Sequence, residues 1–194
     1  MMVSSKNRNN TALVVFTLSL ATLMSSIDTN IVNIALPAIE KSLNISFASV
    51  QWIALGYLLA VTSLIVSIGR IGDIFGKRSI FICGIAIFTV ASLLCGVAGS
   101  IYMLILFRIL QGIGGAVLTA LSFAIVGDLV PKNKLVQSMG ILTSMLPIGI
   151  ALGPAVGGML IGLTGWRFIF FFNVPIGILA FILTLRFPEI PITE

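Results

Sequence analysis

The feature that most limits how this chain can fold is a series of long apolar runs separated by short polar or charged segments. Each run reaches the ~20 residues that an α-helix needs to cross the hydrocarbon core of a bilayer. We therefore expect an all-α integral membrane protein with transmembrane helices at residues 11–37, 50–68, 79–99, 101–126, 135–163 and 168–187. They form one membrane domain, 11–188, between an N-terminal tail, 1–10, and a short tail or truncated linker, 189–194.

The composition excludes soluble and disordered chains alike. Hydrophobic residues make up 58% of the 194 residues and charged residues only 9%, and the mean hydropathy is +1.19. The chain has no histidine and few acids, so it offers almost nothing from which a metal site or a hydrolase triad could be built. Cys83 and Cys95 share one apolar run, roughly 18 Å apart along a helix, too far for a disulfide. We expect no enzyme activity, no metal and no cofactor.

The net charge of +5 reports topology rather than a nucleic-acid partner, because the basic residues are scattered singly between the apolar runs. With the N-terminus inside, the cytoplasmic segments carry Lys6, Arg8, Arg70, Lys77, Arg78, Lys132, Lys134 and Arg186. Only Lys41 and Arg167 then lie outside. Since positive charge concentrates on the cytoplasmic side, we expect a multi-pass protein of the plasma (inner) membrane with both termini cytoplasmic.

A permanent charge lies inside the fourth apolar run. Arg108 is costly there unless it faces a cavity or a paired acid. Helical spacing places it on one face with a set of polar and small residues: Gln111, Gly112, Gly115, Thr119 and Ser122. Its candidate partner is Asp28, which lies at a similar depth in the same leaflet. The alternative is that Arg108 snorkels outward to the lipid headgroups.

Asp28 lies at the edge of a polar stripe on the first apolar run. Ser25, Thr29 and Asn33 recur at four-residue spacing and form a face that does not suit lipid. A helix-packing face is one interpretation, because membrane helices use such side chains as interhelical hydrogen-bond partners. The other is a cavity wall, in which a buried carboxylate takes up and releases a proton and Arg108 favours its ionised form.

Two glycine-rich stretches separate or interrupt the apolar runs. The first, 69–78, is a charged segment that contains Gly69, Arg70, Asp73, Gly76, Lys77 and Arg78. We expect a tight cytoplasmic turn in which Asp73 is suited to latch onto a neighbouring segment. The second places Gly149, Gly153 and Gly157 at four-residue spacing, with Pro154 and Gly158 beside them, where another helix can approach closely. The Gly69 and Gly76 pattern recurs, at equal spacing, as Gly158 and Gly165, which indicates an inverted repeat of three plus three helices.

Taken together, these stretches resemble the major facilitator superfamily, and specifically its fourteen-span drug:proton antiporter branch, the multidrug exporters of the EmrB/QacA kind. Segment 69–78 resembles the loop between spans two and three, and Arg108, Gln111 and Gly112 resemble the motif of span four. Segment 149–158 resembles the antiporter motif of span five, and 28–37 the span-one signature. Tyr57 fits this branch, as do Asn173 and Pro175.

The resemblance implies efflux of small, amphipathic, often cationic compounds in exchange for protons. It implies Asp28, Arg108 and Gln111 in proton or substrate coupling, and a cavity lined by Thr29, Asn33, Tyr57, Gly112, Gly115 and Thr119. It implies 69–78 as a gating loop and the span-five glycines with Pro154 as part of the conformational switch. One departure is Ile74, which stands where the loop motif usually has an arginine, so the latch is expected to be weaker.

A carrier of this family rocks two six-span halves around a midplane site, and this chain matches only the N-terminal half. We therefore expect a fragment, a truncated gene product or half of a dimer, whose partners are the lipid bilayer and either the missing C-terminal half or a second copy. The competing hypothesis is a membrane protein without transport activity of its own, an assembly partner or a remnant. A six-span channel is disfavoured because no paired half-helix motif is present and Asp28 would obstruct a neutral pore.

Overall fold

The computed structural model describes residues 3–188, with side chains from residue 11 onward, and this part of the chain is all helix and connecting turns. Its long helices are α1 (Val3–Leu43), α2 (Phe47–Phe75), α3 (Lys77–Val97), α4 (Ile101–Leu129) and α5 (Lys132–Thr164). The sixth apolar run forms two shorter pieces, α6 (Phe168–Phe171) and α7 (Asn173–Thr184). The predicted all-α fold class is confirmed for this part of the chain.

The helices differ in length from the predicted spans. The five long helices are long and apolar enough to cross a membrane, whereas the α6–α7 segment is shorter. α1 begins at Val3 and runs on through Pro37, so most of the expected N-terminal tail is helical. The tail expected at 189–194 lies outside the described residues.

Segment 69–78 is mostly helix, which corrects the expectation of a loop. α2 continues to Phe75 and α3 begins at Lys77, so that Gly76 alone makes the turn, with φ +90°. A side chain at such a φ is strained, and one glycine is enough to reverse the chain. Gly165 ends α5 in the same way, with φ +94°. The two glycines of the sequence repeat therefore make equivalent turns.

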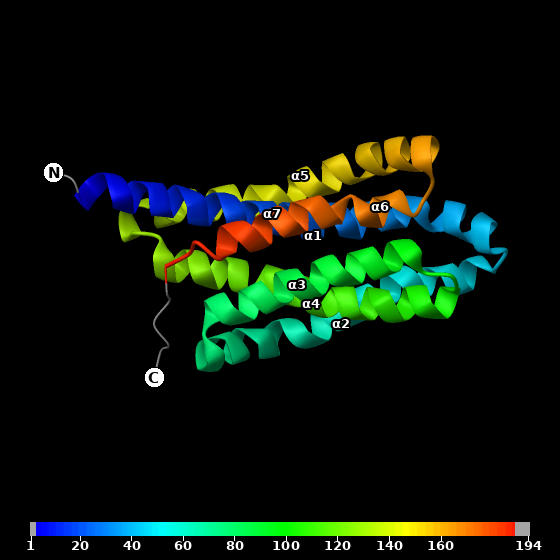
Figure 1. Ribbon diagram of the computed structural model, residues 1–194, viewed down its shortest axis with the longest axis horizontal. Helices are drawn as coiled ribbons and strands as arrows, with labels where there is room; N and C mark the ends of the chain where they lie inside the picture. Colours follow the sequence, from blue (N-terminus) through cyan, green and yellow to red (C-terminus); the bar gives the residue numbers. More distant parts are fainter. Residues whose placement is uncertain (1–2, 189–194) are drawn as a thin grey trace.

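The helices pack in pairs that follow from an inverted repeat. The most extensive interhelical contacts join α2 to α4, α3 to α4 and α1 to α5 (Figure 1). Exchanging the first three helices with the last three converts the α1–α5 pair into the α4–α2 pair, as the three-plus-three organisation requires. The α2–α3 and α4–α5 turns lie at the same end of the bundle as the end of α7, and the other turns lie at the opposite end.

Small residues set how closely α1 and α5 approach. A Cβ atom added at Gly153 would lie 2.7 Å from Asn30 Cβ, and one at Gly157 would lie 2.8 Å from Ile31 Cγ1. Gly149 contacts Ser26, whose hydroxyl donates to the Leu146 carbonyl at 2.8 Å. Gly158, in contrast, has nothing within 4 Å of the corresponding position. The close contact of α5 with α1 therefore depends on Gly149, Gly153 and Gly157 and does not involve Gly158.

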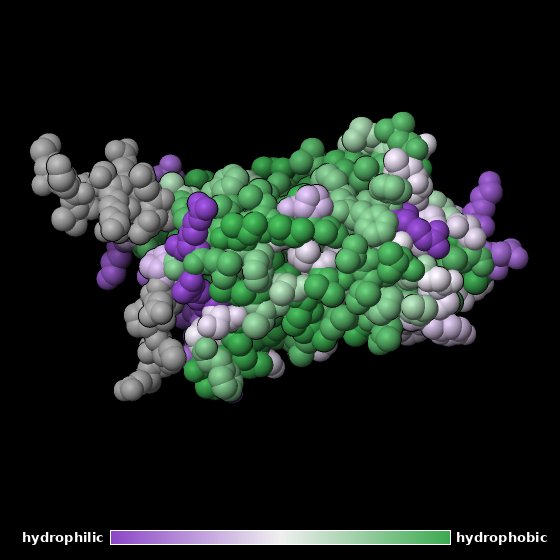
Figure 2. All heavy atoms as spheres, viewed as in Figure 1, coloured by the Kyte–Doolittle hydropathy of each residue, from purple (hydrophilic) through white to green (hydrophobic). Residues whose placement is uncertain are grey.

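The surface suits a bilayer. Figure 2 shows an apolar belt over the middle of the bundle, with the hydrophilic residues gathered toward its two ends. Large side chains such as Val66, Leu106 and Leu163 are exposed on α2, α4 and α5. A contiguous apolar surface of this extent marks contact with lipid or with another protein.

We predict opposite effects for two alanine substitutions in α5. Gly153→Ala forces a methyl group into Asn30 and costs about 1–3 kcal/mol through overpacking. Gly158→Ala meets open space and gains up to ~1 kcal/mol from helix propensity. Thermal unfolding in detergent micelles measures both, with a lower midpoint expected for the first variant only. Equal unfolding midpoints for the two variants would show that Gly153 does not set the α1–α5 distance.

Candidate functional site

Arg108 is buried at the centre of the bundle and forms an ion pair with Asp28. Its guanidinium Nη1 lies 2.6 Å from Asp28 Oδ2, and the two residues are 1% and 0% exposed. The prediction that these two charges face one another is therefore confirmed by their geometry, and the snorkelling alternative is wrong. An isolated buried charge is costly, and here each charge supplies the partner that makes the other tolerable.

Three helices, α3, α4 and α7, contribute the polar side chains around this pair. Gln111, one turn after Arg108 on α4, accepts from Arg108 Nη1 at 2.6 Å and donates to Asp28 Oδ1 at 3.0 Å. The same Gln111 amide donates to Ser92 on α3 at 2.7 Å. Asn173, the first residue of α7, donates to Asp28 Oδ1 at 2.7 Å. All are buried, so the network is shielded from solvent and ties α1, α3, α4 and α7 together.

Aromatic rings and a backbone carbonyl complete the arginine's surroundings. The guanidinium carbon lies 4.2 Å from the centroid of the Tyr57 ring and 5.9 Å from that of Phe170. Arg108 Nε also donates to the Ile53 carbonyl at 3.3 Å. Tyr57 in turn shares a hydrogen bond of 3.1 Å with Ser25 on α1. Cation–π contacts and hydrogen bonds of this kind lower the cost of burying the guanidinium group.

The residues predicted to line a cavity divide into two groups. Tyr57, Gly112 and Gly115 are buried between α2 and α4, where a Cβ at Gly112 would lie 2.7 Å from the Tyr57 carbonyl oxygen. These three pack helices together, so their predicted place on a cavity wall does not match the geometry of this chain. Asn33 is exposed, and Thr29 and Thr119 are partly exposed; both threonine hydroxyls donate to carbonyls of their own helices.

The predicted gating segment holds a small charge cluster at one end of the bundle. Lys77 lies 3.0 Å from Asp73 and 2.7 Å from Asp128, at the end of α4. Arg78 donates to the Leu185 carbonyl at 2.7 Å, which ties the start of α3 to the end of α7. Gly69 and Arg70 belong to the last turns of α2, where Arg70 is exposed. Asp73, expected to latch onto another segment, is paired within its own turn in the described residues.

Ser92 escaped the sequence reasoning, and Asn173 entered it only through the family resemblance. Each is a single polar residue within an apolar run, without a periodic stripe around it. The available signal was the cost of a polar side chain at membrane depth, which favours a partner in the bundle interior. Among the described residues, no three of the metal-binding types gather where they could hold an ion.

We predict strong coupling between Asp28 and Arg108 in stability. Asp28→Asn and Arg108→Gln each leave one buried charge unpaired, which costs about 3–5 kcal/mol. This corresponds to a midpoint lower by roughly 6–20 °C for a chain of this size. The double variant should lose much less than the sum, because neither charge remains. Thermal unfolding in detergent measures the two single variants and the double variant, with Asn33→Ala as an exposed control on α1. Losses of stability that add in the double variant would contradict the pairing.

Three relatives among known proteins are each longer than this chain. It is 39% identical over 82% of its length to the tetracenomycin C resistance and export protein of Streptomyces glaucescens, covering 30% of that protein. It is 34% identical over 94% of its length to the riboflavin transporter RibZ of Clostridioides difficile, covering 40% of it. It is 37% identical over 86% of its length to the multidrug resistance protein Stp of Mycobacterium tuberculosis, covering 31% of it. The chain thus spans about a third of these relatives.

Solved structures agree on the fold. A bacterial homolog of the human lysosomal transporter Spinster, in an inward-facing conformation, superposes with a TM-score of 0.83 at 24% identity, over 95% of this chain and 44% of that one. The proton:xylose symporter XylE superposes equally well at 16% identity, over 95% of this chain and 46% of its own. The family model described as Major Facilitator Superfamily matches residues 18–193. The chain therefore belongs to the Major Facilitator Superfamily.

Proposed function

We propose that this chain forms the N-terminal half of a proton-coupled exporter of the fourteen-span drug:proton antiporter branch. The observation that carries the proposal is the fully buried Asp28–Arg108 pair, in which one carboxylate receives hydrogen bonds from two further helices. Two of the relatives are named for resistance or export, and a third for riboflavin transport. The substrate is a small amphipathic compound, and protons are the coupling ion.

Asp28 is the group that takes up the proton in this proposal. Its carboxylate oxygens receive N–H donors from Arg108, Gln111 and Asn173. Neutralising the carboxyl weakens all three contacts and leaves Arg108 without a counter-charge, so protonation favours a different arrangement of α4 and α7 around α1. The side-chain amide oxygen of Asn173, Oδ1, has no donor in the part of the chain that the structure describes. When the Asn173 side-chain amide rotates, this oxygen can accept a hydrogen bond from a protonated Asp28 carboxyl.

The α1–α5 interface is the proposed route from the proton site to the conformational switch. Ser26, two residues before Asp28, is bonded to the Leu146 carbonyl and contacts Gly149. A shift of α1 around Asp28 therefore displaces Gly149 and Gly153 of α5. These glycines lie next to Pro154, where the helix lacks a backbone hydrogen-bond donor. The charge cluster of Asp73, Lys77 and Asp128 holds the cytoplasmic end of α2–α4 while the other end moves.

We predict that Asp28→Asn and Arg108→Ala abolish proton-driven dye efflux. The first variant removes the titratable group, and the second leaves its carboxylate without the charge that holds it in place. Efflux of a fluorescent cationic dye from energised cells carrying the full-length context measures the effect, with a loss of at least tenfold expected at equal protein levels.

Glu40→Gln is the matched control, because it makes the same carboxyl-to-amide change on the same helix away from the network. It should keep the parent rate. Unchanged efflux in both Asp28 and Arg108 variants would remove their assigned roles. No dye efflux from the parent itself would favour the competing hypothesis, a protein that acts only in assembly or as a remnant.

We predict the orientation in the plasma membrane from the unequal charge of the two ends. With Cys83 and Cys95 replaced by serine, a cysteine introduced at Lys41 should react with a membrane-impermeant maleimide in intact cells. One introduced at Lys132 should react only after permeabilisation. The reverse pattern would place both termini outside.

A further inference from the structure

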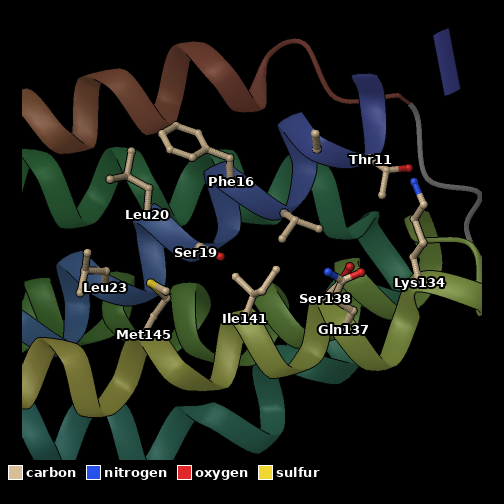
Figure 3. Close-up of a pocket in the computed structure, with 12 residues that line it drawn as sticks. Thr11, Phe16, Ser19, Leu20, Leu23, Lys134, Gln137, Ser138, Ile141 and Met145 are labelled. Atoms are coloured by element: carbon tan, nitrogen blue, oxygen red, sulfur yellow. The ribbon is translucent and has the colours of Figure 1, made fainter. Parts of the chain in front are cut away.

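A cavity of about 560 Å³ lies between the first half of α1 and the first half of α5, away from the Asp28 network (Figure 3). This volume lies in the range of small-molecule sites. The cavity opens on the outer surface of the bundle, because Phe16 and Ile141 on its two walls are 56% and 40% exposed. A ligand can therefore enter it from outside the six-span bundle.

The lining changes from polar to apolar along the groove. Lys134 and Gln137 lie at the end where α5 begins, and Leu20, Leu23 and Met145 lie toward the middle of the bundle. The distance from Lys134 to Met145 is roughly 16 Å along the helix axis. A molecule that fits this gradient has a polar head at the membrane boundary and an apolar tail that reaches toward the bilayer centre.

The charge at the polar end is positive, and no acidic side chain pairs with it in the part of the chain that the structure describes. Lys134 forms no ion pair among the described residues, where Asp28 pairs with Arg108, and Asp73 and Asp128 both pair with Lys77. Lys134 also lies in the first turn of α5, where the helix dipole adds partial positive charge. The head group that this end favours is therefore an anion.

A second observation points to a ligand deeper in the groove. Ser19 is 7% exposed, and its hydroxyl finds no hydrogen-bond partner among the described residues. Figure 3 shows this hydroxyl between the two helices, next to Ile141 and past Ser138 as seen from Lys134. A buried hydroxyl without a partner is unfavourable, and an acceptor oxygen of a ligand would supply the missing hydrogen bond.

We propose that this groove binds an anionic glycerophospholipid of the bilayer, with its phosphate on Lys134, an ester oxygen on Ser19 and one acyl chain against Leu20, Leu23 and Met145. The order of chemical groups in such a lipid, anion, ester and hydrocarbon, is the order of the lining residues. This end of the bundle is the one expected at the cytoplasmic face, where anionic lipids are concentrated. The proposal stands independently of proton coupling and export.

Native mass spectrometry of the purified 194-residue chain tests it, with detergent micelles that contain phosphatidylglycerol or phosphatidylcholine of identical acyl chains. One lysine near the membrane surface accounts for a preference of about fivefold for the anionic lipid. Lys134→Gln should abolish the preference. Lys132→Gln, which removes an equal charge from the same turn but outside the cavity lining, should keep it. Equal retention of both lipids by the parent, or equal loss in both variants, overturns the proposal.

A phosphatidylglycerol with a photoreactive group on one acyl chain locates the site. Labelling should fall on peptides from 11–23 and 134–145, and Ile141→Trp, which fills the groove, should remove it. Ile150→Trp, an exposed position on the same helix, should not. Labelling elsewhere overturns the assignment. Displacement of the lipid by an equimolar soluble amphiphile, dodecyl phosphate, overturns it in favour of a free anionic ligand.

Discussion

The buried ion pair between Asp28 and Arg108 is the interaction on which the rest of this bundle depends. A guanidinium group at membrane depth requires a counter-charge, donors for the counter-charge and a ring or carbonyl for its remaining face. Supplying these brings Gln111 of α4 and Asn173 of α7 onto one carboxylate, and Ser92 of α3 accepts a hydrogen bond from the Gln111 amide. The network thereby fixes the rotation of α1, α3, α4 and α7 about their own axes, which apolar packing against lipid leaves open.

Close helix packing at glycine residues is the second constraint. Gly114 lets α3 and α4 meet at backbone distance, because a Cβ there would lie 2.7 Å from the Phe88 nitrogen. Gly112 does the same for α2 and α4, and Gly153 for α1 and α5. In a membrane such approach replaces the hydrophobic drive that assembles soluble bundles. Polar contacts therefore select the rotation, and glycines select the distance.

The sequence predicted the fold class and the ion pair because both follow from strong, local costs. Apolar length fixed the helices, and the expense of Arg108 required a partner that only Asp28 could supply at the same depth. The boundaries were less accurate, since α2 passes through the charged segment 69–75 and only Gly76 turns the chain. A charged residue at the membrane surface does not by itself end a helix, so the apolar length does not give the helix boundary.

The role of the glycine face on α4 was not predictable from one helix alone. Gly112 and Gly115 share a face with Arg108 in the sequence, and a face of small and polar residues fits either a wet cavity or a close helix contact. The position of Tyr57 decides between them, because its ring lies over Arg108 and its hydroxyl reaches Gly115. The same ring therefore covers the charge and fills the groove that a cavity would need, which leaves Thr29, Asn33 and Thr119 as the accessible members of the predicted set.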